Sequence, residues 1–315
     1  MKHETGGDPI SGLKWTRKTT EKIAKELGKL HIEVSPNTVG RLLKSLGYSL
    51  RLNNKRLESG NKNPPKRRIR NQQFEYIAQI REAFEREGNP VISVDTKKKE
   101  LIGNFKNGGQ TWEKQPLSVY DHDFRSDAQA LAVPFGIYDL QANSGYVCVG
   151  LSADTPAFAV DSIDHWWINE GAKRYPGARD LLILADCGGS NGARSRVWKY
   201  RIQKQLSDTH RLTVNVSHYP PGASKWNPIE HRLFSEISKN WAGRPLRNLQ
   251  TMLNSIRTTT TSTGLQVRAH FVRRKYKKGV KIPEREMRTL SLLRKETLPD
   301  WNYSICPSKG ELIVE

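Results

Sequence analysis

Two aspartates stand directly after short apolar runs of the kind that form buried strands. Asp95 follows the run 91–94, and Asp186 follows the run 181–185. Sites in α/β proteins are usually built at the carboxyl ends of the strands, so neighbouring strands would bring the two side chains together. Because two buried carboxylates repel each other, a divalent cation is the natural partner of such a pair.

Glu230 is the third acid of interest, because it lies in the first turn of a predicted helix over residues 227–241. The helix dipole stabilises an anion there, and the side chain could supply a ligand from above the sheet. Oxygen ligands without a nearby Cys or His cluster favour Mg²⁺, with Mn²⁺ as its substitute, over zinc. Two such ions about 4 Å apart can activate an attacking oxygen and stabilise the leaving oxygen of an in-line phosphoryl displacement. The three acids therefore predict a phosphoryl-transfer site with two metal ions.

Each acid also has an ordinary interpretation. A single aspartate after a strand is more often a turn or cap residue, and a glutamate in the first turn of a helix is common. His122 is flanked by two acids, but no predicted strand places it beside the others, so we expect a loop role. Three scattered cysteines predict neither a zinc site nor a disulfide framework: Cys148, Cys187 and Cys306. Three tryptophans at helical positions are expected in the core: Trp166, Trp167 and Trp241.

The elements that must position the acids follow one another in a definite order. Apolar periodicity predicts helices over 71–87, 155–169, 193–206 and 227–241, and strands over 91–95, 133–140, 146–151, 181–186 and 212–216. Three strands are thus followed by alternating helices and strands, which is the order of a ribonuclease-H-like α/β domain. We therefore expect a mixed sheet flanked by helices over residues 71–260, with residues 96–131 inserted after the first strand.

A smaller all-α domain is predicted before this sheet, over residues 1–50. A short amphipathic helix ends at Gly28, and Ser35 with Pro36 begins a second one as N-cap and first helical residue. Val39, Leu42, Leu43 and Leu46 line one face of the second helix. Two short helices with a tight connection are typical of a helix-turn-helix, although an ordinary helical hairpin has the same pattern. The candidate DNA-binding residues on its outer face are Asn37, Thr38, Arg41 and Lys44.

The charge of the chain indicates a polyanionic partner. There are 52 Lys and Arg against 32 Asp and Glu, a formal net charge of +20, and each phosphate that a cation neutralises releases a condensed counterion. A basic linker is predicted over 51–70 and a basic C-terminal extension over 261–315, where the run 273–278 suits either DNA contact or a solvated tail. No apolar stretch is long enough for a membrane span, and the polar residues 1–13 lead us to expect no secretory signal. We expect a cytoplasmic, nucleoid-associated bacterial protein.

Several longer segments carry a family resemblance. Residues 219–231, which contain Asn227-Pro228-Ile229-Glu230, resemble the segment bearing the last acid of Tc/mariner-like DDE transposases. Residues 91–109, 185–192 and 231–235 resemble the ISAzo-type insertion-sequence transposases, also called the Rhodopirellula transposase family. The resemblance extends from about residue 7 to residue 307. Members usually carry further sequence before the helix-turn-helix, which predicts a shortened copy or an incomplete gene product.

The resemblance implies both an activity and a set of site residues. Asp95, Asp186 and Glu230 would be the DDE triad, and the activity would be hydrolysis at transposon ends followed by transfer of the freed 3′-OH into target DNA. The DNA-bound state would be a dimer or a larger assembly, because two ends must be brought together. Further DNA-binding candidates are Lys97, Lys98 and Arg194, and supporting candidates are Asn191, Asn227 and His231.

Ordinary roles remain open for these residues and for the whole chain. A lysine run is commonly solvated, an asparagine commonly caps a helix, and a surface histidine commonly does no chemistry. A ribonuclease-H-like nuclease would cut DNA without joining it. A transposase-derived repressor, or an immobile remnant, would keep the helix-turn-helix and the charge without needing the triad.

Overall fold

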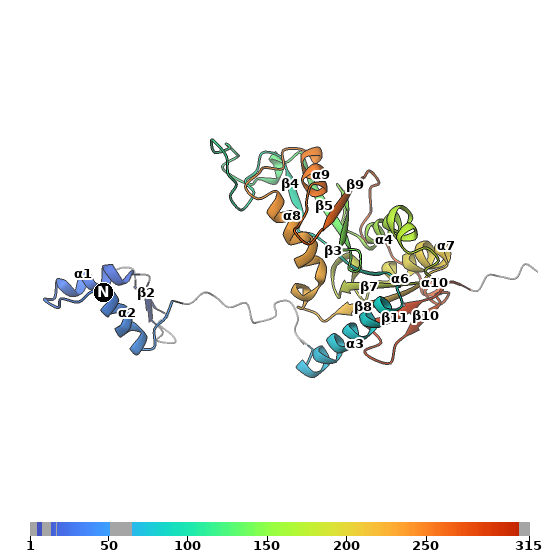
Figure 1. Ribbon diagram of the computed structural model, residues 1–315, viewed down its shortest axis with the longest axis horizontal. Coiled ribbons are helices and arrows are strands. Elements are labelled where there is room, and N and C mark those ends of the chain that lie inside the picture. The colour runs from blue at the N-terminus through green and yellow to red at the C-terminus, as the bar shows by residue number, and fades with distance from the viewer. Residues whose placement is uncertain (1–4, 8–13, 17, 51–64, 309–315) are drawn as a thin grey trace, which may run out of the picture. The chain divides into compact units, whose positions relative to one another are not determined.

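The computed structural model describes residues 5–7, 14–16, 18–50 and 65–308 (Figure 1). Contacts divide the chain into two compact units, residues 1–59 and 60–315, and each unit is described by itself. Most of the predicted basic linker, residues 51–64, lies outside the described residues, and a helix begins at Arg67 within its last part. In the described parts no helix is long and apolar enough to cross a membrane.

The first unit contains the two predicted helices. They are α1 (Thr20–Gly28) and α2 (Pro36–Ser45), with the strands β1 (Thr5–Gly7) and β2 (Lys14–Thr16) before them. Ser35 caps α2 as predicted, since its Oγ accepts a hydrogen bond from the amide of Thr38 at 3.1 Å, and Pro36 is the first helical residue. Of the predicted apolar face, Val39 is buried and Leu43 is half-buried, whereas Leu42 and Leu46 are 50% and 71% exposed.

The second unit is built on a mixed sheet whose described strands number nine. The strand order is β10-β11-β8-β7-β3-β5-β6-β9, and β4 pairs with β5 off this path. The strands are β3 (Val91–Thr96), β4 (Glu100–Ile102), β5 (Ala130–Asp139), β6 (Ser144–Gly150), β7 (Asp180–Asp186), β8 (Thr213–Tyr219), β9 (Gln266–Val272), β10 (Leu292–Arg294) and β11 (Asn302–Ile305).

The centre of this sheet has the predicted arrangement. β3, β5 and β6 form an antiparallel meander, and β7 and β8 run parallel to β3 on its other side. The predicted ribonuclease-H-like fold class is confirmed. The segment 261–315, which we predicted to be an extension, contributes β9 at one edge of the sheet and β10 with β11 at the other.

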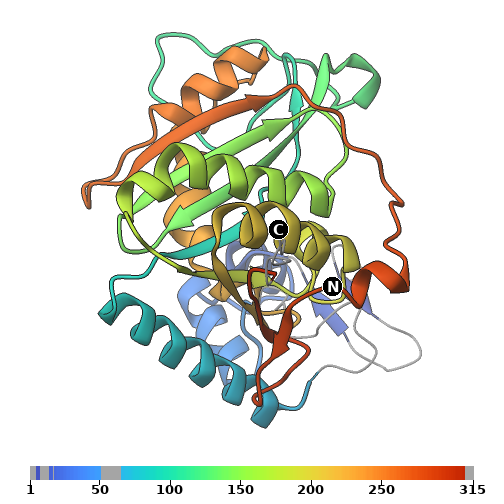
Figure 2. The same cartoon turned by 90° about the vertical axis from the view of Figure 1, so that its right-hand side faces the viewer.

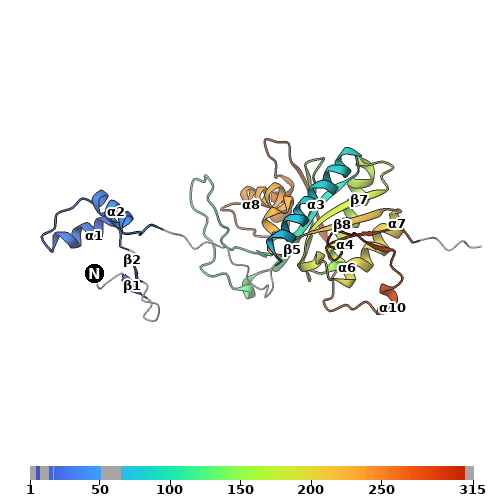
Figure 3. The same cartoon turned by 90° about the horizontal axis from the view of Figure 1, so that it is seen from below.

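Helices cover both faces of the sheet (Figures 1 and 2). On one face lie α4 (Pro156–Trp166), η2 (Trp167–Gly171), α5 (Ala172–Arg174), α6 (Arg196–Arg201), η4 (Ile202–Ser207) and α7 (Asp208–His210). On the other lie α3 (Arg67–Arg86), η6 (Glu230–Phe234), α8 (Ser235–Asn240) and α9 (Leu249–Arg257), and Figure 3 shows α3 and α8 on the same side of the strands. Short helical turns lie in the loops: η1 (Arg125–Asp127), η3 (Gly189–Asn191), η5 (Ser224–Trp226) and α10 (Glu284–Met287).

The core follows from the alternation of side chains along the strands. Ile92 and Val94 of β3 join the cluster under α4 and α6, whereas Val91 joins the cluster under α3. The predicted core tryptophans Trp166, Trp167 and Trp241 are buried. Successive residues of β3 and β7 therefore face opposite layers, and this decides where the strand-end aspartates point.

Candidate active site

Asp95 and Asp186 lie side by side on one face of the sheet. β3 and β7 are parallel neighbours, and Val94 pairs with Ala185, one residue before the two acids. Leu184 of β7 packs on the α3 side, so alternation places Asp186 on that side, and Val91 places Asp95 there in the same way. The two carboxyls therefore lie on the face of the sheet that is covered by the helical segment η6, which begins at Glu230.

Glu230 is brought to this face by close packing of its helix. Ile229, Leu233 and Phe234 are buried against the sheet. Two strand glycines make the approach possible: a Cβ on Gly136 would lie 2.5 Å from a ring carbon of Phe234, and one on Gly145 would overlap Leu233. The helix that carries the third acid thus approaches the sheet closely at two strand positions that have no side chain.

We expect Gly136→Ala to displace this helix. The added methyl overpacks the contact with Phe234 and Ile229, which should cost about 1–3 kcal/mol of stability and move Glu230 enough to lower catalysis by about tenfold or more. Gly150→Ala is the matched control, since its Cβ would meet Phe158 on the opposite face at 3.3 Å. Thermal unfolding and a strand-transfer assay would measure both, and equal activity of the two variants would contradict the prediction.

Asn227 joins all three acid-bearing elements. Its Nδ2 donates to Asp186 Oδ1 at 3.3 Å and to the carbonyl of Val94 at 3.4 Å, while its Oδ1 accepts a hydrogen bond from Ser93 Oγ. Ser93 Oγ in turn accepts from the amide of Ile229 at 3.1 Å. Asn227, which the sequence offered as a supporting residue or as a helix cap, thus contacts the carboxyl of Asp186.

All three carboxyls have raised pKa values, and burial is the main cause for each. Burial, and then the charge of Asp186, raise the pKa of Asp95 to about 8, against a backbone hydrogen bond from Thr96. Burial raises the pKa of Asp186 to about 6, opposed by the amide of Asn227 and supported by the charge of Glu230. Burial also raises the pKa of Glu230, while His231 and Lys97 lower it. The site thus holds more negative charge than it can keep ionised without a cation.

The donor atoms suit a hard divalent ion. All are oxygens, and the buried Asn191 Oδ1 beside them has no hydrogen-bond partner in the structure. Within the described residues, no group of three or more His, Cys, Asp or Glu side chains is close enough together to hold a metal ion. The donor set, which is oxygen alone, fits Mg²⁺ or Mn²⁺.

Asp154 is an acid beside this site that sequence reasoning missed. With Asp95, Lys98, Lys99 and Asn191 it lines a hollow of about 410 Å³. Its Oδ1 accepts from Thr96 Oγ1 at 3.1 Å, and its charge contributes to the raised pKa of Asp95. Its position shortly after an apolar strand, like that of Asp95 and Asp186, was the signal in the sequence.

A buried relay behind Asp186 was also missed. The Nδ1–H of His218 donates to the backbone carbonyl of Asp186 at 2.9 Å, so its Nε2 accepts from Tyr303 Oη at 3.1 Å. Trp198 Nε1 donates to the same Tyr303 oxygen at 3.0 Å. Burial lowers the pKa of His218 to about 4, which keeps the ring neutral. The relay ties the backbone of the second acid to β11. The strand was predicted to end at residue 216, so the sequence carried no signal for His218.

The other predicted residues lie in varied surroundings. Lys97 is buried, pairs with Glu100 at 2.7 Å and lies over the Trp241 ring, so its ammonium already has a partner. Asn191 is buried and donates to the carbonyl of Val94 at 3.5 Å. His231 is exposed and donates to the carbonyl of Lys225. Of the remaining DNA-binding candidates, Thr38 is half-buried and the rest are exposed: Asn37, Arg41, Lys44, Lys98 and Arg194.

Comparisons with known proteins give one family and one group of structures. The family described as "Rhodopirellula transposase DDE domain" matches residues 1–307, and no curated protein matches the chain. Among similar solved structures are a Mos1 transposase paired-end complex with the left transposon end (15% identity, TM-score 0.43) and a Mos1 mariner paired-end complex with Mn (14%, 0.44). Each match covers 74% of this chain and 64% of the Mos1 chain, so the chain spans less than two thirds of those proteins.

Proposed function

This chain belongs to the Rhodopirellula transposase DDE-domain family, and from that premise we propose that it is a DNA transposase that cleaves transposon ends and joins them to target DNA. The observation that carries the proposal is the convergence of Asp95, Asp186 and Glu230 on one face of the sheet. Burial raises the pKa of all three, and the charge of Glu230 raises the pKa of both aspartates further, as expected of ligands for a shared cation.

We assign the three acids as the ligands of Mg²⁺, with Mn²⁺ as a substitute. Two divalent ions held there would activate the attacking oxygen and stabilise the leaving oxygen of the displacement. Asn227 holds the carboxylate of Asp186 in place, and the relay through His218 fixes the backbone that carries it. Asn191, whose Oδ1 lacks a partner, and His231 are assigned supporting roles.

The reaction needs no covalent intermediate with the protein. Water attacks the phosphorus at the transposon end, the P–O3′ bond breaks, and a free 3′-OH and a 5′-phosphate result. That 3′-OH then attacks a target phosphodiester, which forms a new P–O bond and releases a target 3′-OH. The carboxylates would be ionised once a cation is bound, since their part is to hold the cations beside the attacked phosphate.

The DNA contacts are assigned from exposure and charge. The exposed residues of α2, namely Asn37, Arg41 and Lys44, would contact the transposon end, with Thr38 holding Arg41 through a 3.4 Å hydrogen bond. Lys98 and Arg194 would contact phosphates near the acids, while Lys97 balances the charge of Glu230. Because two ends must be synapsed, the active form is a dimer or a larger assembly on DNA.

A strand-transfer assay tests the proposal. The full chain, a pre-cut duplex taken from the ends of its own element, and a supercoiled target plasmid are incubated with Mn²⁺ or Mg²⁺. We expect covalently joined end–target products that disappear when EDTA is added. Hydrolysis without joined products would show a nuclease instead, and binding without either reaction would show a repressor.

A further inference from the structure

The basic run after β9 begins at the same end of the sheet as the acids. β9 pairs in parallel with β6, and across the sheet Thr96 pairs with Phe135, Phe135 with Cys148, and Cys148 with His270. These four paired residues form a line across the sheet that begins at Thr96, next to Asp95. Arg273 lies three residues after His270, the last residue of that line. The run 273–278 therefore leaves the sheet at the end where the candidate active site lies.

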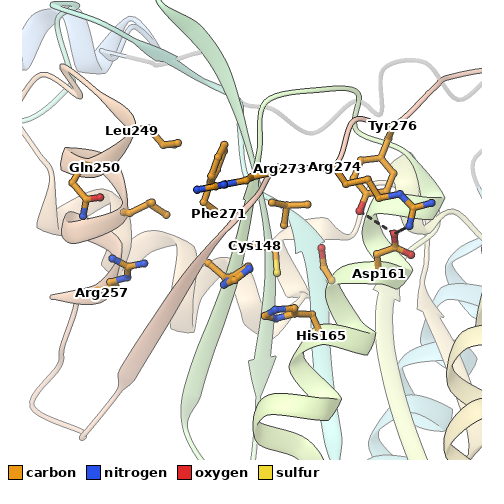
Figure 4. A pocket seen from close by; sticks show the side chains of 14 residues that line it. Cys148, Asp161, His165, Leu249, Gln250, Arg257, Phe271, Arg273, Arg274 and Tyr276 are labelled. Atoms are coloured by element: carbon orange, nitrogen blue, oxygen red, sulfur yellow. Dashed lines mark hydrogen bonds and ion pairs between the residues drawn. The ribbon is translucent and has the colours of Figure 1, made fainter.

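This run is anchored to the catalytic unit. The amide of Tyr276 donates to Ser152 Oγ at 3.1 Å, two residues before Asp154. The hydroxyl of Tyr276 and the guanidinium of Arg274 both donate to Asp161 Oδ2, at 2.9 and 3.0 Å. Figure 4 shows both side chains directed at Asp161, with Arg273 pointing away from it. Three hydrogen bonds therefore hold the run against the second unit.

The anchored residues alternate with exposed cations. Arg273, Lys275 and Lys277 are exposed, and none of them has an ion-pair partner in the described part of the chain. The nearby Asp161 is already shared by Arg201, Arg274 and Tyr276. We call Arg273, Lys275 and Lys277 the basic rim; Arg273 also lines a hollow of about 870 Å³ around the β9 edge. Three cations without ion-pair partners, on a segment anchored by hydrogen bonds, could bind a polyanion.

We propose that the basic rim binds the phosphate backbone of duplex target DNA. This rests on the proposed function, which gives the protein two kinds of DNA to hold. Within the described residues the run 273–278 forms neither helix nor strand that could enter a groove, and such side chains contact phosphates without reading sequence. The transposon end must be recognised by sequence, whereas the target need not be, so the rim is assigned to the target.

The test compares two triple variants of the full chain. R273Q/K275Q/K277Q removes the basic rim, and R86Q/K173Q/R179Q removes three exposed cations that precede the starts of β3 and β7, at the opposite end of these strands. Binding of random-sequence duplex is measured against salt, together with end hydrolysis and joining to target. We expect the rim variant to join ends to target at least about tenfold more slowly than the wild type. The slope of its log binding constant against log salt concentration should be smaller by about 2–3, as for the loss of three phosphate contacts.

The same experiment separates the proposal from its alternatives. The rim variant should hydrolyse ends within about twofold of the wild type, and the opposite-end variant should match the wild type in every assay. Equal joining by the rim variant and the wild type would overturn the proposal, and so would a matching loss of end binding, which would assign the rim to the transposon end. If the wild type itself joins nothing, the proposed function fails first, and the duplex-binding measurement still decides whether the rim binds DNA.

Discussion

Asp186→Asn is expected to lower end hydrolysis and strand transfer by about 10³-fold or more, which is about 4 kcal/mol of transition-state stabilisation. Asparagine has the same shape and still accepts the hydrogen bond from Asn227, but its neutral oxygen is a far weaker ligand for a divalent ion. Because the replaced carboxyl is buried and repelled by Glu230, the variant should fold at least as stably as the wild type. Binding of end DNA by α2 should be unchanged.

Asp180→Asn is the matched control for this prediction. Asp180 lies at the start of the same strand, at the opposite end of the sheet from the acids, and accepts only a long hydrogen bond from Asn215 at 3.4 Å. Its replacement should leave both reactions within about twofold of the wild type. Rates would be measured by gel analysis of labelled end duplexes. Full joining by Asp186→Asn would remove the basis for the catalytic assignment.

Asp95→Asn is expected to stabilise the metal-free protein while abolishing its activity. In the folded chain the pKa of Asp95 is raised from 3.8 to about 8, so between these values the folded state holds a proton that the unfolded chain has released. The free energy of unfolding of the metal-free wild type must then fall as pH rises through this window. Asparagine cannot ionise, so the gain in stability should grow from small near pH 4 to about 2–5 kcal/mol near pH 8.

Thermal unfolding in EDTA from pH 5 to pH 8 measures this difference, and added Mg²⁺ provides the second half of the test. Ion binding must displace the proton from Asp95, so Mg²⁺ should stabilise the wild type more at pH 8 than at pH 6. Asp95→Asn should lose most of that stabilisation at both pH values. A stability difference that did not change with pH, or a Mg²⁺ effect that survived the substitution, would contradict the shared-cation assignment.

Local sequence was sufficient for the elements that present the acids. Apolar runs before Asp95 and Asp186 formed the central parallel strands, and the cap at Ser35 formed as predicted, since such signals depend on residues within a few positions of each other. The order of these elements restricts the topology to few solutions, which explains why the ribonuclease-H-like centre was predictable.

Only the tertiary structure decided how distant segments complete the site. Gly136 and Gly145 matter because a helix some ninety residues later packs onto them, and Asp154 matters because its loop lies beside Thr96. The C-terminal segment was predicted only as a basic extension, yet β11 holds His218 behind Asp186 and β9 ends at the same end of the sheet as the acids. The three acids were visible from the sequence because the two aspartates end apolar strands and Glu230 lies in the first turn of a helix. The contacts between the acids and the residues that support them depend on pairing between residues far apart in the chain, which no local pattern encodes.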